Sequence, residues 1–339
     1  MNDKETSAAL TLLLGILIAL SALGTDLYVP ALPDVAASFA SPVSAVQLTL
    51  TTYFLGLAIG QLVWGPLSDR YGRRPVLLAA LGLMLAVTIA APVSGALLTA
   101  HAGWRAIFWT FALVACGLIV AVAAGLRETA PAERRSAHPA EIARGLGIIL
   151  SDRRFQAPLL LFLSCHMAIL AWVAASAFTL AHMGVAIDAY GWMFAGVMLG
   201  QIAGAWVASR FVLRLGSARL MRGGSWLVLG GGLAVAALAW AGAEHWFALV
   251  GPFAVLLFGT ALILPSATAL ALSPFPQAAG AASSLIGAIG FTAGAALSTL
   301  LGALFDGSAR PMATTAALAG LAAFFFERML ARGKRHGKS

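Results

Sequence analysis

The sequence predicts an all-α protein that crosses a membrane many times. Of its 339 residues, 60% are hydrophobic and only 10% are charged, and the mean hydropathy is +0.91. A soluble core of this length would not need so much apolar surface. The apolar residues also gather into runs long enough to cross the hydrocarbon core of a bilayer, which is about 30 Å thick. We therefore expect a polytopic membrane protein.

The first part of the chain holds four apolar spans. The first is too long, and its outer end too polar, for a cleaved signal peptide. A polar, arginine-rich stretch follows over residues 127–156, and we expect it to be a cytoplasmic linker. Residues 1–126 are thus predicted to form an N-terminal bundle of four helices. Their approximate bounds are Ala8 to Val29 (with an extension past Pro30 and Pro33 to Ala36 as the alternative), Ser44 to Pro66, Pro75 to Leu98 and Trp104 to Leu126.

Residues 157–339 are predicted to form a C-terminal bundle of six helices with a basic tail. Positive loops alternate with loops that are not positive, which places both termini in the cytoplasm. The net charge of +8 then reports topology and contact with anionic lipids, and nucleic acid is not expected as a partner. The six spans are Pro158 to Leu180, Tyr190 to Leu215, Leu220 to Ala241, His245 to Leu272, Gln277 to Ala303 and Pro311 to Leu330.

A short charged loop joins the second and third spans. Its arginines outweigh its single aspartate, so the loop is expected in the cytoplasm, with Pro66 ending the preceding helix. Glycines allow close backbone approach, and Asp69 can cap the next helix or pair with an arginine. The alternative is an ordinary positive-inside loop. The residues that we assign to a cytoplasmic gating motif are Gly65, Asp69, Arg70, Gly72, Arg73 and Arg74.

The spacing G-x-L-x-D-R-x-G-R-R in this loop resembles the cytoplasmic signature of the major facilitator superfamily, a family of secondary transporters. Within it, the likeness is to the bacterial branch named for bicyclomycin and chloramphenicol resistance. The stretches that carry this likeness are Thr25 to Pro33, Arg127 to Thr129, Pro265 to Leu272 and Ala279 to Gly287. The resemblance implies multidrug efflux by proton-coupled antiport and alternating access, in the bacterial inner membrane. It implies protons and small amphipathic or cationic drugs as partners, and no cofactor besides the proton gradient.

The expected ten helices, four plus six, depart from the six plus six of that superfamily. Pro75 to Val87 resembles the inner start of the third family helix, and Thr88 to Leu98 the outer end of the fifth. We infer a fused span that lacks the fourth helix and parts of its neighbours. The membrane-embedded arginine of the fourth family helix is thereby lost. The alternative function is therefore an internally deleted, transport-inactive relative. A monomer is expected, with oligomerisation as the alternative that the missing helices raise.

Asp26 is the predicted proton- and substrate-coupling residue. It is the only ionisable group well inside the first span, and an unpaired carboxylate in lipid is costly. Facing a cavity, it would take up and release a proton near neutral pH. The alternative is that Asp26 lies near the outer interface and caps a kink at Pro30.

Polar and aromatic side chains of the other spans are candidates for the walls of a drug cavity. For the aromatic ones the alternative is helix packing, and for His166 it is a hydrogen bond between helices. We find no paired nucleophile and base, zinc ligands or phosphate loop, so no enzyme and no metal site is expected. The cavity candidates are Tyr28, Gln47, Thr51, Tyr53, Gln61, His166, Trp172, Phe178 and Gln201.

Overall fold

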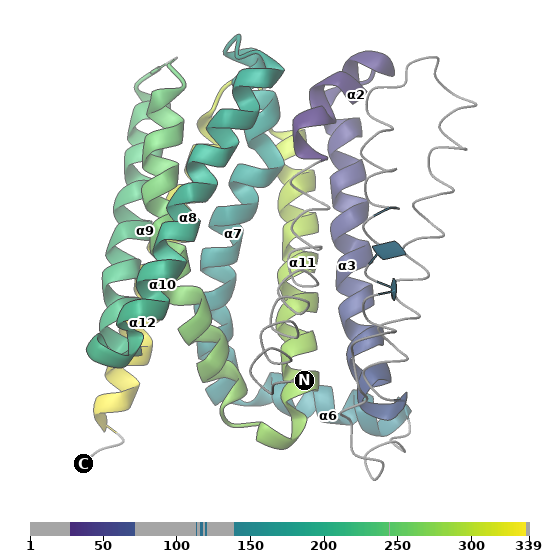
Figure 1. The fold of residues 1–339 in the computed structure, drawn as a ribbon, viewed down its shortest axis with the longest axis vertical. Helices are drawn as coiled ribbons and strands as arrows, with labels where there is room; N and C mark the ends of the chain where they lie inside the picture. Colours follow the sequence, from purple (N-terminus) through teal and green to yellow (C-terminus); the bar gives the residue numbers. More distant parts are fainter. Residues whose placement is uncertain are drawn as a thin grey trace, which may run out of the picture. The chain divides into compact units, whose positions relative to one another are not determined.

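A computed structural model describes residues 28–71, 113, 116–117, 119–120, 139–243 and 245–336. Every regular element in these ranges is a helix, as the composition predicts. Seven of the described helices are long and apolar enough to cross a membrane. Their bounds are α3 (Val43–Tyr71), α7 (Arg153–His182), α8 (Ile187–Leu215), α9 (Ser217–Trp240), α10 (Phe247–Leu272), α11 (Ala279–Ala303) and α12 (Arg310–His336) (Figure 1).

These seven helices correspond to seven of the ten predicted spans. Among the other predicted spans, Pro75 to Leu98 lies outside the described residues, as do all but a few positions of Trp104 to Leu126. The first span is described only from Tyr28 onward. There a short 3-10 turn, η1 (Val29–Ala31), leads into α2 (Leu32–Ser38). A proline in the first turn of each element explains the break, because proline lacks an N–H and is favoured where a helix starts. The count of ten helices stays a prediction.

Two expected helix ends differ in the structure. Pro66 does not end α3, which continues to Tyr71. A proline removes one backbone hydrogen bond, and membrane-spanning helices tolerate that loss. α7 begins at Arg153, five residues before Pro158, because Asp152 caps it. The Asp152 carboxylate accepts a hydrogen bond from the backbone N–H of Arg154 at 2.7 Å, which satisfies a free donor of the first turn.

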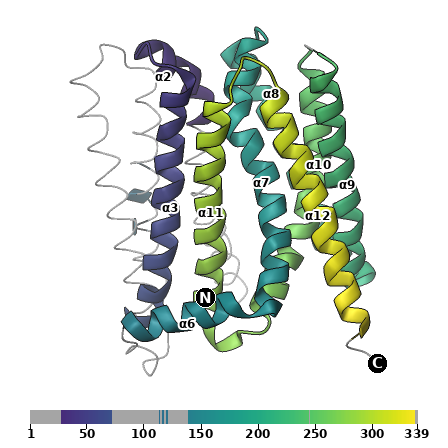
Figure 2. The same ribbon diagram turned by 180° about the vertical axis from the view of Figure 1, so that it is seen from behind.

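The predicted linker contains a helix, α6 (Pro139–Ser151), that its polar composition concealed. In both ribbon views α6 runs across the ends of α7 and α11 (Figures 1 and 2). Ile149 anchors it in an apolar cluster with Phe155, Leu159 and Leu285, while Ile148 is 63% exposed. One side of α6 thus packs on the ends of the spanning helices, and the other side is exposed.

The chain divides into two compact units, and the predicted bundles with boundaries at 126 and 156 stay a prediction. The smaller comprises residues 1–40 and 62–142, and the larger comprises 41–61 and 143–339. The first two-thirds of α3 therefore belong with the C-terminal helices. Within the larger unit, α7 packs against α10, α11 and α12, and α9 packs against α10 and α12.

Glycines allow some of these helices to touch through their backbones. A Cβ atom added at Gly224 of α9 would lie 2.7 Å from the carbonyl oxygen of Gly259 of α10. One added at Gly259 would lie 2.8 Å from the Gly224 carbonyl. No side chain fits at either position without moving backbone, so this pair sets the spacing of α9 and α10.

Candidate functional site

The predicted coupling residue Asp26 lies outside the described residues, as do Gly72, Arg73 and Arg74 of the gating motif. The remaining motif residues, Gly65, Asp69 and Arg70, fall within the final turns of α3. Tyr28 is half-buried directly before η1 and belongs to the smaller unit. The roles assigned to these residues stay predictions. The other cavity candidates all lie in the larger unit.

Gln47 is the centre of a buried polar network that joins three helices. Its side chain is on α3 and only 1% exposed. The Gln47 amide nitrogen donates to the backbone carbonyl of Ala174 on α7. Its amide oxygen accepts a hydrogen bond from the Ser298 hydroxyl of α11 at 2.8 Å. In an apolar environment each such group needs a partner, so the glutamine holds the three helices in register.

Thr51 continues this network one turn further along α3. Its hydroxyl contacts the Thr299 hydroxyl of α11 at 3.0 Å and donates to the backbone carbonyl of Gln47 at 3.1 Å. At Gly302 of α11, an added Cβ would lie 2.7 Å from the Cβ of Gln47, so the two backbones approach closely here. We call Gln47, Thr51, Ser298 and Thr299 the polar seam. Ser298 and Thr299 were not among the predicted residues.

An aromatic layer follows the polar seam along α3 and α11. Phe54 of α3 lies beside Phe291 of α11, with ring centroids 6.2 Å apart, and Tyr53 is the chain neighbour of Phe54. The edge of Phe291 meets the His166 ring of α7 at 5.7 Å. His166 also stacks on Phe162 at 5.4 Å. The predicted histidine thus packs among aromatic rings where α3, α7 and α11 meet.

Gln61 marks the other end of the contact between α3 and α11. Its side chain lies against Gly287, where an added Cβ would come within 2.9 Å of the Gln61 amide carbon. Gln61 itself is exposed, unlike Gln47. The two glutamines of α3 therefore share a helix and a partner helix but differ in environment.

Trp172, Phe178 and Gln201 are placed apart from the seam. Trp172 is fully buried between Phe253 of α10 and Phe194 of α8, at centroid distances of 5.0 and 6.3 Å. Phe178 faces Phe305 at 6.1 Å. Four polar atoms in the described part of the chain are buried without a hydrogen-bond partner, and two of them are the indole nitrogen of Trp172 and the amide oxygen of Gln201. Most of these aromatic contacts join helices of the same unit. They fit the alternative that these aromatic side chains serve helix packing.

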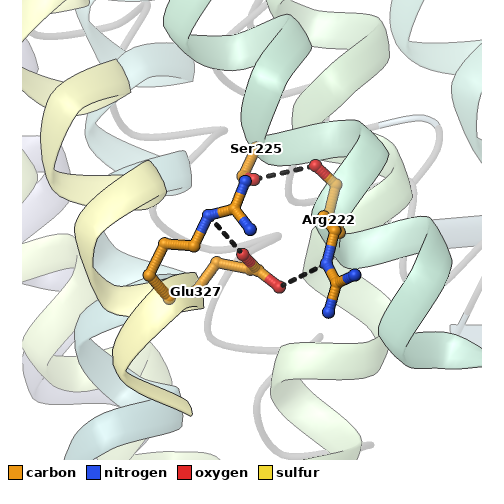
Figure 3. A network of polar contacts seen from close by, with 4 residues as sticks. Arg222, Ser225 and Glu327 are labelled. Atoms are coloured by element: carbon orange, nitrogen blue, oxygen red, sulfur yellow. Dashed lines mark hydrogen bonds and ion pairs between the residues drawn. The ribbon is translucent and has the colours of Figure 1, made fainter. Parts of the chain in front are cut away.

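Glu327 of α12 is a buried carboxylate that the predictions did not include. It is 3% exposed and lies between two arginines (Figure 3). Its carboxylate oxygens are 4.0 Å from Nε of Arg222 on α9 and 3.7 Å from Nε of Arg328. The sequence could have indicated this site, because Glu327 is the only acidic residue of the predicted span Pro311 to Leu330. A buried charge is costly unless it is paired, and two arginines compensate this one.

Aromatic rings hold one of these arginines in place. The Arg328 guanidinium lies over the rings of Phe324 at 4.8 Å and Trp226 at 5.5 Å. Those two rings are themselves 4.6 Å apart, one on α12 and the other on α9. The arrangement ties α9 to α12 by charge and by cation–π contact. Residues 222–226 and 324–328 thus form an ordered basic group at one end of the bundle.

Comparison with known proteins identifies the family. The model of the Major Facilitator Superfamily matches residues 14–94 and 81–299. The two matches overlap at residues 81–94, inside the span Pro75 to Leu98 that we inferred to be a fusion. The family match is therefore split at the predicted place.

Individual relatives have names that refer to drug resistance. A bicyclomycin resistance protein homolog of Haemophilus influenzae is 27% identical over 383 aligned positions, which cover 93% of this chain and 94% of the relative. Multidrug resistance protein D of Escherichia coli is 25% identical, covering 84% of this chain and 86% of the relative. A chloramphenicol resistance protein of Pseudomonas aeruginosa is 48% identical over a stretch covering 23% of this chain and 20% of that relative.

The length of the first alignment shows that this chain lacks residues that the homolog has. Its 383 positions include 93% of the 339 residues, about 315, so about 68 positions (383 minus 315) have no residue here. Among solved structures, the human organic anion transporter MFSD10 (TETRAN) matches with a TM-score of 0.66 and 16% identity. That match covers 96% of this chain and 100% of the other, and it shows a shared fold. The family match, which covers most of the sequence, and the seven described apolar helices together establish that this chain belongs to the Major Facilitator Superfamily of multi-pass membrane transporters.

Proposed function

We propose that this protein exports small amphipathic or cationic drugs across the bacterial inner membrane in exchange for protons. The observation that carries the proposal is the alignment with the bicyclomycin resistance protein homolog, which covers 93% of the chain. Relatives named as a multidrug resistance protein and as a multidrug transporter support the same substrate class. In this proposal both termini lie in the cytoplasm and the gating motif faces that side.

The polar seam suits a transporter that changes shape. All four of its side chains are neutral, and a hydrogen bond between membrane helices is worth only about 0.6–2 kcal/mol. Contacts of this strength hold two helices in one state and are exchanged for other partners at little cost. The unpartnered polar atoms of Trp172 and Gln201 are groups that a polar ligand or water would satisfy.

Asp26 has the coupling role in this proposal. A carboxylate inside a membrane span accepts a proton more readily than one in water, because burial disfavours the charged form. A cationic drug would compete with the proton for this one group. Competition for a single carboxylate couples export of the drug to entry of the proton.

The test is export of a fluorescent cationic dye driven by a pH gradient, from cells that lack their own pumps. Wild type and Asp26→Asn are compared at equal membrane abundance. Asp34→Asn is the matched control, because Asp34 is an exposed acid in the first turn of α2, a helix separate from the Asp26 segment. We expect wild type and Asp34→Asn to export the dye and Asp26→Asn to lose export. Equal export by all three would contradict the role of Asp26.

The second candidate function is a membrane protein that inserts and folds but does not transport. The split family match at residues 81–94 and the unmatched alignment positions favour it, because the loss of part of the N-terminal bundle would produce both. Under this proposal, wild type exports no dye although the purified protein unfolds cooperatively on heating. Dye export by wild type excludes it.

A further inference from the structure

Four side chains on neighbouring helices form an exposed surface that is both basic and aromatic. Arg222 and Trp226 come from α9, and Phe324 and Arg328 come from α12; we call them the α9–α12 surface. The Arg222 and Arg328 side chains are 45% and 35% exposed, and Trp226 is 55% exposed. The surface therefore offers two cations and an indole to its surroundings.

The buried Glu327 carboxylate lies beside both guanidinium groups before any ligand arrives. Glu327 contacts only the Nε atom of each arginine, at 4.0 and 3.7 Å (Figure 3). A guanidinium has further N–H donors on its two terminal nitrogens, and these remain free of Glu327. Ser225 donates its hydroxyl to the backbone carbonyl of Arg222 at 2.9 Å. Two arginines and one glutamate leave a net charge of +1, which favours an anion.

The depth of this surface matches the boundary between hydrocarbon and headgroups. Arg328 follows Arg310, where α12 begins, by 18 residues, which is about 27 Å along a helix. That distance is close to the thickness of the bilayer core, about 30 Å. Tryptophan is enriched at this boundary, and basic groups gather on its cytoplasmic side. Phe325 beside the surface is 62% exposed, as expected where acyl chains cover it.

We propose that the α9–α12 surface binds the headgroup of an anionic phospholipid of the cytoplasmic leaflet. The lipid phosphate accepts hydrogen bonds from the terminal nitrogens of Arg222 and Arg328. Trp226 packs against the glycerol region and Phe325 against the acyl chain. Glu327 is a positioning residue, since it holds both guanidinium groups and does not touch the lipid. The site is independent of what the protein transports.

The test compares lipids that differ only in headgroup charge. The full-length protein in neutral detergent is titrated with phosphatidylglycerol or phosphatidylcholine of identical acyl chains. Bound lipid is counted by native mass spectrometry, and the thermal midpoint is recorded. The test variant is Arg222→Gln/Arg328→Gln. The matched control is Arg210→Gln/Arg214→Gln, which removes the same charge from two exposed arginines near the end of α8.

We expect wild type and control to prefer phosphatidylglycerol, and the test variant to lose roughly tenfold or more of that preference. Equal preference in test and control variants would overturn the site, because charge alone would then explain binding. Inorganic phosphate giving the same thermal shift as the lipid would overturn the lipid assignment. Trp226→Ala with both arginines intact is expected to weaken phosphatidylglycerol binding without abolishing the headgroup preference, and loss of that preference would contradict the roles assigned.

Discussion

Ser298 of α11 donates its hydroxyl hydrogen to the side-chain oxygen of Gln47 on α3 across 2.8 Å, although 251 positions separate the two residues in the chain. The same glutamine donates to the carbonyl of Ala174 on α7. One side chain thus joins three helices. Its 1% exposure makes the network a part of the packed interior.

Replacing Gln47 tests whether the polar seam stabilises the fold. Gln47→Leu keeps the bulk but removes the side-chain bonds to Ser298 and to the Ala174 carbonyl, leaving the Ser298 hydroxyl only the Gln47 backbone carbonyl at 3.4 Å. We expect a loss of about 1–2 kcal/mol, seen as a lower thermal midpoint in detergent. Thr52→Val is the control, because the exposed Thr52 hydroxyl bonds only to the Leu48 carbonyl of its own helix. Equal midpoints for the two variants would mean that the seam contributes nothing to stability.

The backbone contact between α9 and α10 predicts opposite effects at neighbouring glycines. Gly224→Ala places a methyl group against the Gly259 carbonyl and should cost about 1–3 kcal/mol by overpacking. At Gly223 an added Cβ meets nothing within 4 Å, so Gly223→Ala should be neutral or stabilising by up to about 1 kcal/mol. Thermal unfolding of the two purified variants measures the difference. A similar loss at both positions would argue against close backbone contact.

The ion pairs of Glu327 predict an energetic coupling between α9 and α12. Glu327→Gln and Arg222→Gln, alone and together, form a double-mutant cycle. Because the carboxylate is buried and Arg222 is half-exposed, we expect a coupling of roughly 1–2 kcal/mol, between the values of surface and fully buried pairs. The cycle is measured from unfolding midpoints at low salt. Strict additivity of the two single changes would show that the 4.0 Å contact does not contribute.

The loop between α11 and α12 predicts a pH-dependent contribution to stability. The Ser308 hydroxyl donates to Asp306 Oδ1 at 2.6 Å and the Ser308 backbone N–H donates to the same atom at 2.9 Å, and these bonds lower the pKa of Asp306. A carboxyl with a lowered pKa stabilises the fold at pH above its ordinary value. That stabilisation disappears as the pH falls through the lowered pKa.

Ser308→Ala removes the hydroxyl bond to Asp306 and should raise the pKa of Asp306 toward its ordinary value. It also removes the bond from the Arg310 backbone N–H to the Ser308 hydroxyl at 3.2 Å, a loss that does not depend on pH. The variant should therefore be less stable than wild type at neutral pH, and the difference should shrink, without vanishing, in strong acid. Thermal midpoints recorded as a function of pH measure this. Ser151→Ala is the control, since the exposed Ser151 hydroxyl bonds only to the Gly147 carbonyl of its own helix. A difference between Ser308→Ala and wild type that does not shrink in acid would contradict the account.

The described helices follow the predicted spans closely, but two features of the chain escaped prediction. Apolar run length does not reveal α6, whose single well-buried anchor Ile149 depends on the cluster beneath it. Pro66 was predicted to end its helix, yet α3 continues past it to Tyr71. The α6 difference arises because other helices supply packing that local propensity does not register, and the Pro66 difference because membrane-spanning helices tolerate the loss of one backbone hydrogen bond.

The candidate site was predictable only in part. Gln47 and Thr51 were predicted to line a cavity, and that role stays a prediction; their partners Ser298 and Thr299 were not predicted, because serine and threonine are common in apolar helices. Glu327 was overlooked although it is the single acid of its predicted span. The predicted role of Asp26 stays a prediction, since Asp26 lies outside the described residues.

The sequence alone determined the helical class, the membrane spans and the likeness to a transporter family. These depend on local properties, since a membrane helix satisfies its own backbone hydrogen bonds and needs only enough consecutive apolar residues. Only the tertiary structure decided that Gln47 meets Ser298, that Gly224 meets Gly259 and that Glu327 lies between two arginines. Each of these contacts joins residues far apart in the chain, and no local pattern encodes which distant groups become neighbours when the helices pack.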